Sequence, residues 1–192
     1  MKWFWLVSWT NSNLCANVTN DTEYSKTTYK KGIIVFIIHA NSGWEKIAGG
    51  SHVTIYFADP GFASDGESNN PTLYDPSGSY DGGIKGAIRT PNGIFSEEGT
   101  SNPETFINSV LQRENGEYIN AYFIEATPEQ QSKMIERAIE NGDGIGFNCA
   151  DNVSDVMREI GFKHVLTPRG LEKQLRRSDI VTGQKVYTNE TK

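Results

Sequence analysis

Cysteine, histidine and long apolar runs are all scarce in this chain of 192 residues. Two cysteines are too few for a disulfide framework, and three histidines without carboxylates at metal-ligand spacing give no zinc site. No window approaches the roughly 18–20 consecutive apolar residues of a membrane span. Basic residues are in the minority, and the net charge of −6 disfavours nucleic-acid binding. We therefore expect no metal, no cofactor, no nucleic-acid partner and no integral membrane segment.

The remaining composition indicates one globular domain. Hydrophobic residues make up 36% of the chain and aromatic residues 11%, which is enough for a core, and the charged fraction of 22% is ordinary. Residues 31–192 are expected to form this domain, with residues 1–30 as an N-terminal arm or extension. The apolar run over residues 3–7 is too short for a convincing signal peptide, so the sequence leaves the localisation open.

Hydrophobic patterning predicts strands mainly in the first half of the domain and helices mainly in the second, which favours an α+β fold. The β-branched run over residues 31–39 is typical of a strand that is buried on both faces. Further strands are predicted over residues 52–57, 72–75, 118–126 and 185–187. Helices are predicted to start at Pro103, Pro128 and Pro168, and another runs from Cys149 to Gly161.

Cys149 is the strongest candidate for chemistry, because it lies at the start of a predicted amphipathic helix. The free N–H groups of a helix N-terminus stabilise a thiolate and can also donate hydrogen bonds to a developing oxyanion. The alternative is a small buried hydrophobic residue, which is a common fate of free cysteine. A bond to Cys15 would block the nucleophile, so we expect both thiols to be free.

His52 is the candidate base, since it begins a strand just after a Gly-Gly-Ser turn, where a rigid element can present it to a thiol. Asp75 ends the next strand, and antiparallel pairing would place its carboxylate beside His52 to orient the imidazole. A structural histidine and a turn-forming Asp75 remain the alternatives. Asp151 and Asp155 are other candidates for the orienting group.

Three segments carry a resemblance to a known family: GSHVTIY over residues 50–56, LYDPSGSY over residues 73–80 and FNCADNV over residues 147–153. Their order resembles the circularly permuted, papain-like group of the NlpC-type peptidase superfamily, over roughly residues 31–165. The resemblance implies a central antiparallel sheet packed against helices, with the nucleophilic cysteine at a helix N-terminus. It also implies a cysteine amidase or peptidase with Cys149 as nucleophile, His52 as base and Asp75 as orienting residue.

Within these motifs, Ser51, Tyr56, Tyr74 and Asn148 are the candidates for substrate contacts, although the aromatic residues could equally be packing residues. The LYDPSGSY segment is also similar to bacterial effector toxins of contact-dependent secretion, such as type VI effectors. That likeness implies a peptide or peptidoglycan substrate, delivery to a target-cell periplasm and a possible immunity protein. Relatives of the family include lecithin:retinol acyltransferase-like enzymes, so acyl transfer remains an alternative, as does a non-catalytic binding module.

Overall fold

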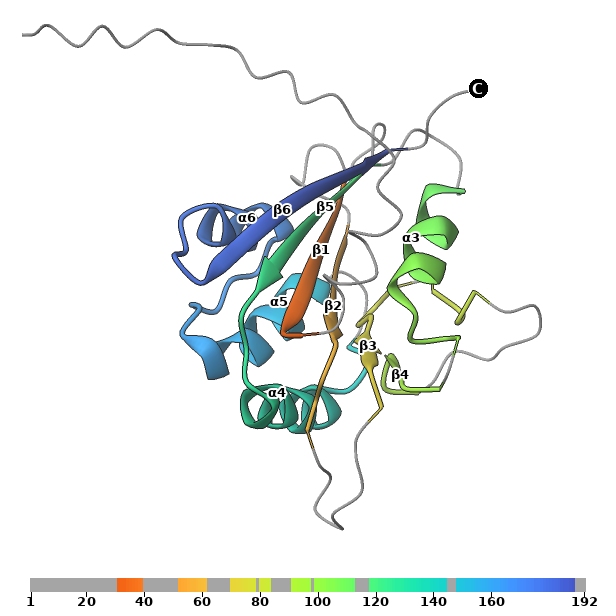
Figure 1. The fold of residues 1–192 in the computed structure, drawn as a ribbon, viewed down its shortest axis with the longest axis horizontal. Helices are drawn as coiled ribbons and strands as arrows, with labels where there is room; N and C mark the ends of the chain where they lie inside the picture. The colour runs from red at the N-terminus through yellow and green to blue at the C-terminus, as the bar shows by residue number, and fades with distance from the viewer. Residues whose placement is uncertain are drawn as a thin grey trace, which may run out of the picture.

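In the described part of the chain, six strands form one antiparallel sheet with the spatial order β4-β3-β2-β1-β5-β6 (Figure 1). This computed structural model describes residues 31–39, 52–61, 70–78, 80–83, 91–97, 99–112, 118–144 and 148–188. The predicted N-terminal arm lies outside these residues. The strands are β1 (Ile33–His39), β2 (His52–Phe57), β3 (Thr72–Tyr74), β4 (Ile94–Phe95), β5 (Tyr118–Ile124) and β6 (Val181–Thr188). The helices are α3 (Pro103–Leu111), α4 (Pro128–Asn141), α5 (Cys149–Val156) and α6 (Pro168–Leu175), and the 3₁₀ helix η1 (Met157–Ile160) continues α5.

The central strand β1 is buried on both faces, as its unbroken β-branched run predicts. It pairs with β2 on one side, where Ile38 lies opposite His52, and with β5 on the other, where His39 lies opposite Tyr118. The end of β1 therefore lies next to the beginning of β2. The beginning of β5 and the end of β6 lie at this same end of the strands, where Tyr118 pairs with Thr188.

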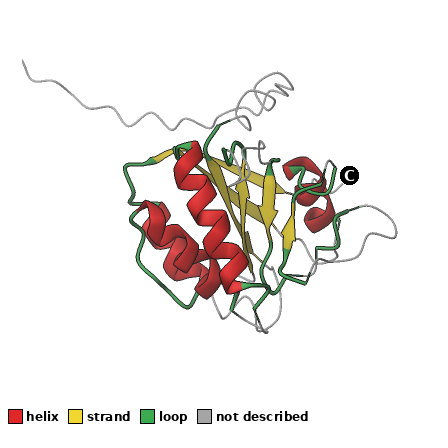
Figure 2. Ribbon diagram, turned by 90° about the horizontal axis from the view of Figure 1, so that it is seen from below, coloured by secondary structure: helices red, strands yellow, loops and turns green. Residues whose placement is uncertain are grey.

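Helices cover both faces of the sheet, and this explains why its inner strands lack polar alternation (Figure 2). On one face, α4, α5 and α6 pack onto alternate residues of β1 and β2. On the other face, α3 packs onto the residues in between. From the helices, the first layer takes Met134, Ala138, Ala150, Val153, Val156, Leu171 and Leu175, and the second takes Phe106, Ile107 and Val110.

Local sequence signals account for the helix boundaries. Asn102 caps α3, and its Oδ1 accepts from the N–H groups of Glu104 and Thr105 at 2.8 and 3.2 Å. Thr127 and Gln130 form the predicted capping box at the start of α4. The six-stranded antiparallel sheet and the helices packed against it confirm the predicted α+β class and the antiparallel sheet. No helix among the described residues is long and apolar enough to cross a membrane.

Candidate active site

Cys149 is the first residue of α5, as the sequence predicts, and it lies where this helix meets the sheet. Its side chain is a free thiol and the residue is only 4% exposed. The preceding residue, Asn148, is exposed and its side chain makes no capping hydrogen bond. The backbone N–H of Asn152 donates to the Asn148 carbonyl, which is the first hydrogen bond of the helix. The N–H groups of the first turn are therefore available near the sulfur.

His52 lies at the start of β2, close to Cys149. The pairing of β2 with β3 covers residues 55–57 only, so the first residues of β2 extend beyond it. The His52 side chain is 16% exposed, and its Nε2 lies 2.5 Å from Oδ1 of Asp75. Because Nε2 is engaged by Asp75, Nδ1 is the ring nitrogen left for Cys149, and the interaction with His52 lowers the pKa of the thiol.

Asp75 follows β3 directly, and antiparallel pairing with β2 brings it to His52. The residue is 1% exposed, and its carboxylate accepts several hydrogen bonds. The Thr54 hydroxyl donates to Oδ1 at 2.6 Å, and the backbone N–H of Tyr80 donates to Oδ2 at 3.3 Å. Donors on both oxygens compensate the burial of the carboxylate and fix its orientation toward the imidazole.

The turn after Asp75 is held in place by two kinds of contact. A Cβ on Gly78 would lie 2.0 Å from Asp75 Oδ2, so the chain passes the carboxylate at a distance that only glycine allows. Ser77 adopts a φ of 56° and donates its backbone N–H to the Asp143 carbonyl at 2.6 Å. The Tyr74 hydroxyl donates to the Gly142 carbonyl at 2.6 Å. These bonds tie the end of β3 to the connection that leads from α4 into α5.

The charges of His52 and Cys149 stabilise each other. Burial alone would lower the pKa of His52, but the charge and hydrogen bond of Asp75, together with Cys149, raise it to about 10. Burial alone would raise the pKa of Cys149, but His52 and the backbone N–H groups of Val53 and Ala150 lower it. The raised pKa keeps His52 an imidazolium at neutral pH, and the lowered pKa of Cys149 increases the fraction of thiolate, which is the nucleophilic form of cysteine.

The four predicted substrate contacts have different positions. Ser51 lies outside the described residues, and Asn148 remains exposed beside Cys149. Tyr56 and Tyr74 are only 5% and 0% exposed, and they pack into the cores on opposite faces of the sheet. Of the two roles that the sequence leaves open for these tyrosines, their burial favours packing. Burial on both faces of the sheet makes them packing residues.

The other histidines also pair with carboxylates, but none of these pairs includes Cys149. His164 contacts Asp151 in the connection after η1, so Asp151 is not the partner of His52. Asp155 instead pairs with Arg158 at 3.0 Å. Among the described residues, no group of three or more histidine, cysteine or acidic side chains is arranged to hold a metal ion.

Sequence reasoning missed a buried polar cluster around Glu172 of α6. Its Oε1 accepts hydrogen bonds from Asn120, Tyr122 and Arg176, each at 2.8 Å, and its Oε2 lies 3.5 Å from His39. These bonds outweigh the effect of burial and lower the pKa of Glu172. A glutamate in an amphipathic helix is normally a surface residue, so only its neighbours in space reveal the cluster. The roles of Thr54 and of the backbone N–H groups next to the Cys149 sulfur are likewise visible only from their neighbours in the folded chain.

Comparison of the chain with models of protein families, with curated proteins and with solved structures finds no match. The geometry of Cys149, His52 and Asp75 is therefore the basis for assigning a function.

Proposed function

We propose that the protein is a cysteine-dependent amidase or peptidase in which Cys149 is the nucleophile, His52 the general base and acid, and Asp75 the orienting residue. One observation carries the proposal: a buried thiol at a helix N-terminus has its pKa lowered by a histidine whose Nε2 lies 2.5 Å from a buried carboxylate. A nucleophile, an adjacent base and a group that orients the base form an established arrangement for nucleophilic cysteine catalysis.

The mechanism follows from the charges of the site. The Cys149 thiolate attacks the carbonyl carbon of an amide, and the carbonyl π electrons move onto oxygen to give a tetrahedral oxyanion. Backbone N–H groups of the first turn of α5 stabilise that charge. The imidazolium of His52 then donates its proton to the amide nitrogen, the C–N bond breaks, and the amine leaves. His52 removes a proton from water, which attacks the thioester, and the acid is released as Cys149 regains its original state.

The fold supports the finer proposal of a permuted papain-like domain. The chain order of the three residues is His52, Asp75 and Cys149, and the histidine and aspartate come from neighbouring antiparallel strands. The family that this order resembles suggests an amide in a peptide or in peptidoglycan as the substrate. It also suggests an effector toxin that acts in a target-cell periplasm and is neutralised by an immunity protein.

The test is hydrolysis of purified cell-wall sacculi, followed by mass spectrometry of the released fragments. We expect the full chain to release fragments with new amino and carboxyl termini and to form a covalent acyl-enzyme at Cys149. Cys149→Ala and His52→Ala should abolish both signals while the far-UV circular dichroism spectrum is unchanged. His164→Ala is the matched control, because His164 also pairs with an aspartate but does not contact Cys149, and it should remain active.

Two results would contradict the proposal. Hydrolysis that survives in Cys149→Ala would show that the thiol is not the nucleophile. Full antibacterial activity of Cys149→Ala without any hydrolysis would point to a binding module. Acyl transfer from lipids, with sacculi left intact, would retain the roles of the three residues but replace the amide substrate by an ester.

A further inference from the structure

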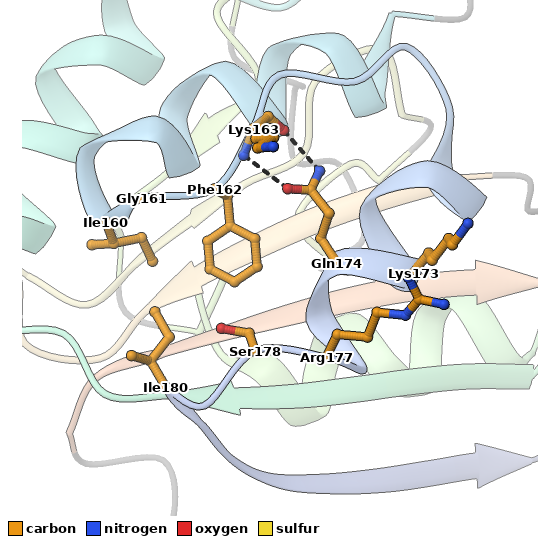
Figure 3. A pocket seen from close by; sticks show the side chains of 9 residues that line it. All are labelled: Ile160, Gly161, Phe162, Lys163, Lys173, Gln174, Arg177, Ser178 and Ile180. Carbon is orange, nitrogen blue, oxygen red and sulfur yellow. Dashed lines mark hydrogen bonds between the residues drawn. The ribbon is translucent and has the colours of Figure 1, made fainter.

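A pocket of about 450 Å³ lies between the end of η1 and the C-terminal half of α6 (Figure 3). It is separate from the candidate active site, because Cys149 begins α5 and Ile160 ends η1. From Cys149 to Ile160, α5 and η1 span about 18 Å, since an α-helix rises 1.5 Å and a 3₁₀ helix about 2.0 Å per residue. A ligand in this pocket would therefore bind without contact to Cys149.

One end of the pocket is apolar. Phe162 lies at its centre and points toward Ser178 and Ile180, and Ile160 completes this side (Figure 3). Ile180 is 37% exposed and is one of the few large hydrophobic side chains on the described surface. This end is suited to one aliphatic or aromatic side chain of a ligand, because removing such a side chain from water is favourable.

The other end is cationic. Lys173 projects from α6 and Arg177 from the turn after it, both on the side away from Ile160 and Ile180, and Lys163 comes from the loop after η1 (Figure 3). All three residues are exposed, and none has a carboxylate partner among the described residues. The lining contains no acidic residue, although the whole chain carries a net charge of −6. The pocket therefore has a local charge opposite to that of the protein.

The walls of the pocket are fixed by hydrogen bonds. The Gln174 side chain accepts from the Lys163 N–H and donates to the Lys163 carbonyl, both at 2.8 Å, and so joins the loop to α6. The Phe162 N–H donates to the Met157 carbonyl at 3.2 Å. A preformed pocket loses little conformational entropy when a ligand binds.

We propose that this pocket docks an acidic peptide segment of a partner protein. One apolar side chain of the segment would pack on Phe162 and Ile180, and flanking aspartate or glutamate side chains would pair with Lys163 and Arg177. Charge complementarity selects this occupant. A short acidic segment covers only the three cations of the pocket, whereas an anionic membrane or a nucleic acid also presents its charge to the acidic remainder of the chain and is repelled there.

The test begins with selection of random dodecapeptides displayed on phage against the full chain. We expect the enriched peptides to carry an apolar residue flanked by aspartate or glutamate. The best peptide, synthesised with a fluorophore, is then titrated by fluorescence anisotropy. Lys163→Glu and Arg177→Glu should each weaken binding at least tenfold, and 0.5 M NaCl should weaken it as well. Lys133→Glu is the matched control, because Lys133 is an exposed lysine of α4 outside the pocket, and it should bind like the wild type.

Three results would overturn the proposal. The first is enrichment of neutral or basic peptides, or no enrichment at all. The second is equal weakening by Lys133→Glu and Arg177→Glu, which would indicate a general charge effect. The third is loss of peptide binding after alkylation of Cys149, which would indicate that the peptide binds at the active site and not in this pocket. Loss of hydrolysis in Cys149→Ala tests only the proposed function, and this variant should bind the peptide normally.

Discussion

Gly78→Ala provides a sharp test of how the Asp75 carboxylate is held. The added methyl group would lie 2.0 Å from Oδ2 and 2.4 Å from both Cγ and Oδ1 of Asp75. Contacts this short force the carboxylate away from His52 and Thr54. A hydrogen bond to a charged group contributes about 1.5–3 kcal/mol. At about 1.4 kcal/mol per factor of ten, its loss slows reaction of the Cys149 thiolate by up to about two orders of magnitude.

The free energy of unfolding should decrease by about 1–3 kcal/mol in the same variant, which is the usual cost of overpacking a buried site. A double-mutant cycle identifies the atoms that clash. Asp75→Ala removes all three atoms that the new methyl group would meet. Gly78→Ala should therefore cost little further stability in an Asp75→Ala background, because the two substitutions share one contact.

The assay is alkylation of Cys149 by iodoacetamide at pH 6, followed by mass spectrometry of the Cys149 peptide, with urea unfolding measured in parallel. Gly183→Ala is the matched control: a Cβ there lies 3.5 Å from Phe123, an ordinary contact in β6. The reasoning is refuted if Gly78→Ala alkylates as fast as Gly183→Ala. It is also refuted if the stability losses of Gly78→Ala and Asp75→Ala add in the double variant.

Three further predictions concern other contacts of the fold. Thr54→Val removes the hydroxyl that donates to Asp75 Oδ1 at 2.6 Å, so alkylation of Cys149 at pH 6 should slow by roughly tenfold, and an unchanged rate would contradict this role. Tyr74→Phe removes the bond to the Gly142 carbonyl and should reduce the urea-unfolding free energy by about 1 kcal/mol, whereas no change would show that the bond contributes nothing. Glu172→Gln should cost about 1–3 kcal/mol near pH 7. Because the folded state lowers the pKa of Glu172, its contribution is present above the usual value of 4.5 and is lost as the pH falls below it, so wild type and variant should converge in acid.

The sheet and its helices are largely predictable from local patterns. The β-branched run of β1 and the capping residues of α3 and α4 act over a few positions, so the sequence alone indicates them. Strand β4 is not predicted, because two residues are too few to show a periodicity. Strand β6 begins at Val181, before the predicted start at residue 185, since most of its residues are exposed and polar.

The positions of Cys149, His52 and Asp75 follow from the same patterns, because a helix start and two neighbouring strands are recognisable one by one. Their supporting contacts are not recognisable in this way. The burial of Tyr56 depends on helices that cover both faces of the sheet. Residue 78 must be glycine because a Cβ there would clash with the Asp75 carboxylate. This distance is a property of the folded chain, and no local sequence pattern indicates it.

We infer that His52 and Asp75 activate the Cys149 thiol. The most direct test is the rate at which iodoacetamide alkylates Cys149 between pH 4 and pH 10, because this measurement needs no knowledge of the substrate. Because the pKa of Cys149 is lowered, the wild type should react faster than glutathione at pH 6, and His52→Ala should remove this advantage. An equal rate for Cys149 and glutathione at pH 6, or the same pH profile with and without the His52 imidazole, would contradict the account.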